Sequence, residues 1–396
     1  MPKISKILLL AVSVVLVLTV FLGVNSPGVN AASESQDGAY RQINVYSEVL
    51  RHIQTDYVTE PDMAAVTNGA LRGLLESLDA DSSYLSPADY KTFKADKGGR
   101  AQVGIHVSKR YGYATVVSVV PGSPADKANL NDGDILEAID GKDTRNISLA
   151  MLRLMLEGDA GSQLTVAVVR PQSAVPDKIT MTRTMVEEPA VSETMYENSS
   201  ILYIKPVILD HDHVQQVEAR LKGMQRAGNK KILLDLRDVT AGNMAEATRL
   251  ANFFLKSGTI AMLEGQTVSK QTFTADPSKA INATDPMVVL VNRGTSGPGE
   301  LVAGALLDNN RAELVGERTF GEGAQQKTFE MPDGAALILT VAKYETPSGK
   351  KIQDDAVTPE VLVASSSDDS DNATKPGVSV DDQLNKALDI LKGKNS

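Results

Sequence analysis

Residues 290–326 read LVNRGTSGPGELVAGALLDNNRAELVGERTFGEGAQQ and carry the clearest local structural signals in the chain. The short apolar run Val288–Val291 predicts a buried parallel strand, and Glu300–Asn309 has apolar residues at helical spacing. Between them, Gly297 can serve as the N-cap of the helix and Pro298 as its first residue. A turn from a strand into a helix presents backbone N–H groups that can stabilise an oxyanion, so this turn is a candidate hydrolase site.

This stretch resembles the active-site segment of the C-terminal processing peptidases, which are serine endopeptidases with a Ser/Lys dyad. The family pattern is roughly G-[ST]-x-S-x-S-E-[IL]-x-A-G-A-L-x-D-N-x-R-A, followed by V-G-E-x-T-[FY]-G-K-G-x-x-Q. The match is long and ungapped, and the resemblance extends over about residues 40–391. The residues that agree with the pattern in this segment are Gly294, Thr295, Glu300, Leu301, Ala303–Leu306, Asp308, Asn309, Arg311, Ala312, Val315–Glu317, Thr319–Gly321, Gly323 and Gln326.

The catalytic positions depart from the pattern. The resemblance places the nucleophilic serine at Gly297 and the general-base lysine at Glu322, while Gln326, which matches the residue that orients the lysine, is kept. Gly297 has no hydroxyl, and a glutamate with a reference pKa of about 4.3 is a poor base for an alcohol. No catalytic dyad is therefore intact. Ser296 is the alternative nucleophile, although a shift of one residue moves the hydroxyl by about 3.8 Å along the chain.

A further departure follows the predicted strand Lys231–Arg237, which matches the family's I-L-D-L-R segment. The family continues with N-x-P-G-G or a close variant, and the backbone of that glycine turn helps to form the oxyanion hole. Gly242 keeps the second glycine, whereas Ala241 replaces the first. A Cβ at that position can restrict both the backbone angles and the available room.

Residues 98–172 resemble a PDZ domain, with LNDGDIL at 130–136 and IDG at 139–141 as the most specific segments. In this fold a groove strand adds a peptide strand through main-chain hydrogen bonds, and a nest of N–H groups takes a terminal carboxylate. The resemblance therefore implies binding of peptides or protein C-termini. The positions that it assigns to the groove are Val103, Gly104, Ile105, His106, Val107, Leu152 and Met155.

The order of the matched segments predicts an α/β fold (α+β multidomain) with a helical N-terminal segment, an inserted PDZ domain and an α/β peptidase-like core. We expect the helical domain at 36–97, where DADSSYLSPADY (79–90) resembles the family's L-D-P-H-S-S-Y-[LF]-[ST]-P. The core is expected at 173–364 plus 379–392, with an acidic linker at 365–378. In the family the N-terminal helices assemble dimers or cap the core, so a homodimer is left open.

The N-terminus has the pattern of an export segment. Lys3 and Lys6 precede the apolar run Ile7–Val24, and Val29–Ala31 ends in a small residue suited to cleavage. The run also just reaches membrane-spanning length. Residues 1–32 are therefore expected to be a cleaved signal peptide or a retained single-span anchor. Either outcome places the bulk of the chain in the cell envelope or beyond it: periplasmic, extracytoplasmic and membrane-anchored, or secreted.

Composition narrows the function classes further. The 396 residues carry a formal charge of −10 with no basic stripe, which argues against a nucleic-acid partner. Cysteine is absent, so disulfides and thiolate metal sites are excluded. The histidine pair in Asp210–His213 lacks the third ligand that zinc needs, so we expect no metal and no cofactor.

Two functional hypotheses remain. The first is an exported pseudopeptidase that binds peptides without cutting them, which the missing dyad favours. The second is an active serine endopeptidase that carries out proteolysis with a displaced nucleophile such as Ser296. An envelope scaffold that binds no peptide is a third, less specific alternative, because a fold alone does not determine function.

Overall fold

The computed structural model describes residues 27–96, 98–110, 112–170, 175–227, 230–365 and 381–394. The chain divides into two compact units after Asn68. The first unit contains helix α2 (Pro27–Asp56) and the start of α3 (Met63–Glu76). Most of the predicted signal or anchor, residues 1–32, and most of the predicted linker, residues 365–378, lie outside the described residues. Among the described helices, none is both long and apolar enough to cross a membrane.

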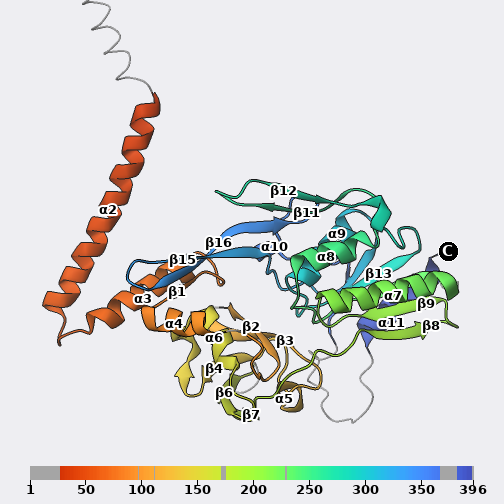
Figure 1. Cartoon of the computed structure of the whole chain (residues 1–396), viewed down its shortest axis with the longest axis horizontal. Coiled ribbons are helices and arrows are strands. Elements are labelled where there is room, and N and C mark those ends of the chain that lie inside the picture. The colour runs from red at the N-terminus through yellow and green to blue at the C-terminus, as the bar shows by residue number, and fades with distance from the viewer. Residues whose placement is uncertain are drawn as a thin grey trace, which may run out of the picture. The chain divides into compact units, whose positions relative to one another are not determined.

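The second unit contains a largely parallel sheet with the strand order β17-β14-β13-β10-β9-β8 (Figure 1). Its neighbouring strands are parallel except for the edge pair β8–β9, which is antiparallel. Helices α7, α8 and α9 pack on one face, and α11 packs on the other. The bounds are β8 Ser192–Tyr196, β9 Ile201–Lys205, α7 His211–Ala227, β10 Lys231–Asp235, α8 Met244–Asn252, β13 Met287–Val291, α9 Pro298–Asp308, β14 Glu313–Gly316, β17 Val361–Leu362 and α11 Asp382–Gly393.

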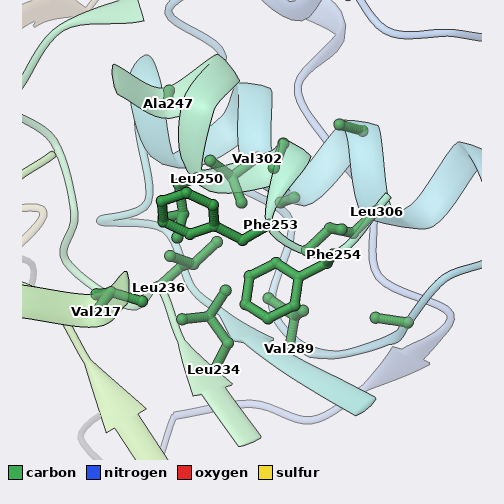
Figure 2. Packing of buried hydrophobic residues seen from close by; sticks show 14 of the residues in the cluster. Val217, Leu234, Leu236, Ala247, Leu250, Phe253, Phe254, Val289, Val302 and Leu306 are labelled. Carbon is green, nitrogen blue, oxygen red and sulfur yellow. The ribbon is translucent and has the colours of Figure 1, made fainter. Parts of the chain in front are cut away.

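Both faces of this sheet are apolar, which is the pattern of parallel strands covered by helices on each side. On one face Leu234 packs against Phe254, which follows α8 (Figure 2). On the opposite face Leu233 and Leu290 pack against Leu391 of α11. Successive side chains of a strand point to opposite faces, so the short strands β10 and β13 contribute to both cores at once.

A second, antiparallel sheet has the order β1-β16-β11-β12, with β15 also paired to β16. Its strands are β1 Ser83–Leu85, β11 Thr259–Glu264, β12 Gln271–Thr274, β15 Ala324–Glu330 and β16 Ala336–Glu345. Three further short helices in this unit are α4 Pro87–Ala95, η2 Pro277–Lys279 and α10 Ile352–Asp355. The expected helical domain at 36–97 is therefore wrong in part. Residues 83–85 pair with a strand about 250 residues later, Tyr84 lying opposite Leu337.

A third sheet, antiparallel throughout, has the order β2-β3-β4-β6-β7, with β5 paired to β4. Helix α6 packs beside its edge strand β2. The bounds are β2 Ile105–Arg110, β3 Tyr113–Val119, α5 Pro124–Lys127, β4 Ile135–Ile139, β5 Lys142–Asp143, η1 Thr144–Asn146, α6 Leu149–Leu156, β6 Gln163–Val169 and β7 Asp177–Thr182. The α/β class with these three parts, predicted from the sequence, is confirmed.

The expected boundary at residue 172 is wrong, because β7 belongs to the third sheet and not to the peptidase-like core. Strand β7 pairs with β6 along its whole length. Beyond it, Thr184 exchanges two backbone hydrogen bonds with Gln102, at 2.8 and 3.0 Å, which closes the domain on itself. The Pro- and Ser-containing stretch after Val169 looks like a linker in sequence, but it joins two strands of one sheet.

The packing of α11 generates a stability prediction. Leu391 is fully buried against the parallel sheet, so Leu391→Ala should lower the free energy of unfolding by about 2–5 kcal/mol. Leu362→Ala is the matched control, because that side chain is 69% exposed and its loss should change stability by less than about 0.5 kcal/mol. Urea denaturation of both variants measures the two effects. Equal effects would mean that α11 does not cover the sheet.

Candidate active site

The turn between β13 and α9 keeps the backbone of a nucleophile elbow without the nucleophile. Gly297 caps α9 with φ 51° and ψ −109°, a combination that side-chain-bearing residues rarely adopt. A Cβ built there would meet its nearest atoms, the carbonyl oxygens of Glu322 and Thr240, at 3.5 and 3.8 Å. Space for a side chain is therefore present, pointing between the two segments predicted to carry the base and the oxyanion turn. Such strained strand-to-helix turns expose the nucleophile of many hydrolases.

A buried carboxylate holds this turn against the loop that carries residue 322. Glu300 is fully buried and accepts hydrogen bonds from the backbone N–H groups of Gly297 (3.0 Å), Gly321 (2.7 Å) and Glu322 (2.8 Å), and from the hydroxyl of Thr319. Burial raises the pKa of Glu300 to about 7, although all four donors act to lower it. The distance between positions 297 and 322 is thus set by one side chain.

Glu322 is engaged on both of its oxygens. The hydroxyl of Ser296, which is fully buried, donates to Oε2 at 3.0 Å. The guanidinium of Arg153, on helix α6 of the third sheet's domain, donates to Oε1 at 3.0 Å. Ser296, the alternative nucleophile, is therefore in contact with Glu322 at the base position, and no pattern in the sequence indicates that Arg153 joins them.

Asp81 is a second acidic group beside Arg153. Its carboxylate lies 4.0 Å from the guanidinium and accepts a hydrogen bond from the amide of Gln353 at 3.3 Å. Burial, and then the charge of Glu322, raise the pKa of Asp81 to about 6. A signal for this residue was present in the sequence, because Asp81 stands where the pattern L-D-P-H-S-S-Y has histidine.

On the oxyanion side of the candidate site, a backbone N–H donor is missing at Pro298. In a nucleophile elbow, one oxyanion donor is the backbone N–H of the residue after the nucleophile. That residue is Pro298, which has no N–H. Ala241, in contrast, is not among the residues with positive φ, so its Cβ imposes no backbone strain. Gly242 (φ 132°) packs against Leu209, where a Cβ would come within 2.5 Å of the backbone.

Gln326 lies on β15 with its backbone opposite Thr340, and its side chain is exposed. No hydrogen bond joins its side chain to Glu322 in the part of the chain that the structure describes. The role of orienting a lysine at position 322, which the resemblance gives to Gln326, therefore has no counterpart in the contacts of Glu322.

A pocket of about 330 Å³ joins the groove beside β2 to this site. Of the residues assigned to the groove, Ile105, His106 and Val107 line this pocket. Val103 and Leu152 are completely buried in the domain core, Gly104 is buried, and Met155 is half-buried. The resemblance assigned Leu152 and Met155 of α6 to the groove, but both pack in or against the domain core. The lining residues that sequence reasoning missed are Gln102, Val117, Arg153, Leu156, Glu157 and Thr240.

The histidines of the 210–213 segment make local contacts. His213 bonds to Asp210 at 2.7 Å and to the carbonyl of Pro189 at 3.2 Å, and His211 lies 3.2 Å from Glu246. Within the described ranges, no group of three or more His, Asp or Glu residues is arranged to hold a metal ion.

The buried Glu300 generates a pH prediction. Its pKa is raised from 4.5 to about 7 by folding, so its stabilising contribution is complete below about pH 4.5 and is lost as the pH rises through about 7. From about pH 5 to about pH 8, this group should lower the free energy of unfolding by roughly 2–3 kcal/mol.

Glu300→Gln should be less stable at low pH, because its amide N–H₂ group meets backbone donors, but it should lack this pH-dependent loss. Urea denaturation of both proteins at the two pH values isolates the effect, since all other groups titrate in both. Parallel pH slopes would show that Glu300 keeps an ordinary pKa.

Comparison with known proteins accounts for this architecture. Residues 200–363 match peptidase family S41, and residues 115–170 match the PDZ domain. The chain is 30% identical over 402 residues to a carboxyl-terminal-processing protease of Synechocystis sp., covering 97% of this chain and 93% of the relative. It is 32% identical to the corresponding protease of Picosynechococcus sp., covering 83% of this chain and 79% of the relative.

Among solved structures, the fold is similar to that of a photosystem II D1 C-terminal processing protease. The TM-score is 0.67 at 24% identity, with 81% of this chain and 92% of that chain covered. From its sequence relatives, its S41 core and its PDZ domain, this chain belongs to the family of carboxyl-terminal processing proteases.

Proposed function

We propose that this chain is an exported pseudopeptidase, which binds peptides or protein C-termini through its PDZ domain and does not cut them. One observation carries the proposal: the elbow that would present the nucleophile is formed around Gly297 and is followed by Pro298. The turn therefore lacks both the attacking hydroxyl and one donor of the oxyanion hole. The family relationship explains the fold, while the activity depends on these side chains.

The expected loss of activity is large. Removing a triad nucleophile in a serine protease costs on the order of 10⁶ in turnover, and removing one oxyanion donor costs about 10²–10³. At the base position, Glu322 is a carboxylate engaged by Arg153 and Ser296, not a neutral amine facing a serine. An acceptor that is already paired with a guanidinium has little tendency to take a proton from an alcohol.

One contact favours the rival hypothesis of an active endopeptidase. Ser296 donates to Glu322 at 3.0 Å, which is the geometry of a hydroxyl and a carboxylate base. Against it, Ser296 has no exposed surface, and its backbone N–H is bonded to the carbonyl of Val239 at 2.9 Å. A substrate carbonyl has no access to this hydroxyl unless the turn moves.

The pocket supports peptide binding. Its walls come from the PDZ groove and from Thr240 and Glu322 of the core, and the hydroxyls of Ser118 and Thr240 lie 2.8 Å apart across the two parts. A peptide in the groove would therefore pass beside the candidate active site, which in this proposal is inactive. The signal peptide or anchor at residues 1–32 and an extracytoplasmic location are further parts of this proposal, which the sequence pattern of the N-terminus supports, and a homodimer stays open.

The proposal predicts that the native protein leaves an unstructured substrate such as casein intact. The chain has no hydroxyl at position 297, so prolonged incubation followed by mass spectrometry should detect no cleavage above the buffer background. Ser296→Ala is the control for the rival hypothesis. Cleavage by the native protein that disappears in Ser296→Ala would identify the displaced serine as the nucleophile and end the proposal.

A series of variants that restores the dyad side chains, and then the backbone N–H at position 298, tests which of these groups limits proteolysis. Gly297→Ser with Glu322→Lys restores the dyad side chains, at a backbone cost of about 1–3 kcal/mol for serine in this conformation. We expect this double variant to be weakly active at most. Adding Pro298→Ala supplies the missing N–H and should raise the cleavage rate by about 10²–10³.

Pro298→Ala alone is the matched control and should remain inactive, because it adds a donor without a nucleophile. Equal rates for the double and triple variants, measured with the same fluorogenic peptide, would show that the missing N–H of Pro298 is unimportant.

A further inference from the structure

The pocket shared by the PDZ groove and the candidate active site carries more negative than positive charge. Glu157 and Glu322 contribute carboxylates to its wall, and Arg153 is the one cation among the side chains that line it. His106 adds no charge at neutral pH, because burial and the nearby Arg153 lower its pKa to about 4. A ligand that enters this pocket therefore meets an acidic surface.

Arg153 does not offset both carboxylates. Its guanidinium nitrogen Nη2 is already bonded to Glu322 at 3.0 Å and lies 4.0 Å from Asp81. Arg153 is thus shared by Glu322 and Asp81, and the charge of Glu157 is additional to theirs. The excess negative charge sits at the end of the pocket that Glu157 occupies.

Glu157 has an unsatisfied oxygen. Its Oε2 is buried and has no hydrogen-bond partner in the part of the chain that the structure describes. Burial, with a smaller effect from the charge of Asp96, raises the pKa of Glu157, and Arg100 only partly opposes this. The described part of the chain thus leaves this carboxylate incompletely satisfied, and a cation in the pocket that Glu157 lines would supply an opposite charge.

Glu157 lies near the end of the groove that would receive the carboxylate of a peptide C-terminus. The next residue, Gly158, donates its backbone N–H to Ala101 at 2.8 Å, so Glu157 is beside the segment that leads into β2. This is the end of the groove at which the resemblance places the carboxylate of a peptide C-terminus. A free carboxylate there would meet the negative charge of Glu157, and like charges repel.

The remaining walls suit a long basic side chain. Ile105, Val107 and Leu156 are apolar, and they can cover the aliphatic stem of lysine or arginine while its head group reaches a carboxylate. Strand β2 is the edge of its sheet, paired only with β3, so its other edge can pair with an added peptide strand. Backbone pairing would align the peptide, and the acidic end would select its side chain.

We propose that this groove binds a polypeptide segment with a lysine or arginine side chain, whose cation is held by Glu157 and Glu322, in preference to a chain end held by its carboxylate. The proposal rests on the function proposed above, namely that the groove binds peptides. It goes beyond it by naming the chemistry that the peptide must offer.

The test measures fluorescence anisotropy of labelled peptides with the full chain. A set of apolar peptides carries one lysine, one acetyl-lysine or one glutamate at the same position, each with a free and an amidated C-terminus. We expect the lysine peptide to bind at least about fivefold more tightly than its acetyl-lysine counterpart, the size of a partly screened ion pair. The advantage should decrease with added salt, and amidation should not weaken binding.

Variants assign the effect to its residues. Glu157→Gln and, separately, Glu322→Gln should each reduce the lysine advantage, measured in each variant as the ratio of the dissociation constants of the acetyl-lysine and lysine peptides. Asp159→Asn is the matched control, because this exposed carboxylate lies two residues from Glu157 but does not line the pocket. An equal loss in Asp159→Asn would mean that general surface charge attracts the peptide, and it would overturn the proposal.

The remaining outcomes separate the two proposals. Peptides that bind equally with lysine, acetyl-lysine or glutamate, or only with a free C-terminus, would overturn the preference for a cation and leave peptide binding intact. Failure of every peptide to bind would overturn the proposed peptide-binding function itself, and with it this inference.

Discussion

Four hydrogen bonds to the carboxylate of Glu300 are the constraint on which the candidate site depends. A buried carboxylate is tolerated only when its oxygens are satisfied, and here the donors come from both the elbow and the loop carrying Glu322. The loop and the elbow therefore fold as one piece whatever occupies positions 297 and 322. Much of the match to the family pattern, including Thr319 and Gly321, serves this clamp and would be retained in the absence of catalysis.

The charges around Arg153 distinguish this site from one with a lysine base. Glu322 and Asp81 both lie within 4.0 Å of the same guanidinium nitrogen of Arg153, Nη2, so one arginine is shared by two acids. A lysine at position 322 would instead place an ammonium beside Arg153, and the two cations would repel each other. The carboxylate at 322 is therefore compatible with the observed contact between the PDZ helix and the core, and the contact is an argument against treating Glu322 as an isolated substitution.

Local signals predicted the strand, turn and helix around Gly297, whereas long-range strand pairing was not readable from one sequence. The strand, the turn at Gly297 and helix α9 appear where the apolar spacing and the Gly-Pro signal place them. Strand β1 was missed because its partner is distant in sequence, and β7 was assigned to the wrong domain because its hairpin resembles a linker. The contact of Arg153 with Glu322 joins two parts of the fold, so no local pattern predicts it. The missing N–H of Pro298, in contrast, was readable from the sequence once the elbow geometry was considered.

The same substitution can remove one function and supply another. A carboxylate at position 322 is a weak base toward an alcohol, but it is a strong partner for a cation in a partly buried pocket. Glu157 lines the same pocket, and Arg153 is already shared with Asp81, so carboxylates outnumber the cation around it. Position 322 therefore bears on both proposals, because it is the base position of the family pattern and also belongs to the wall of the PDZ pocket.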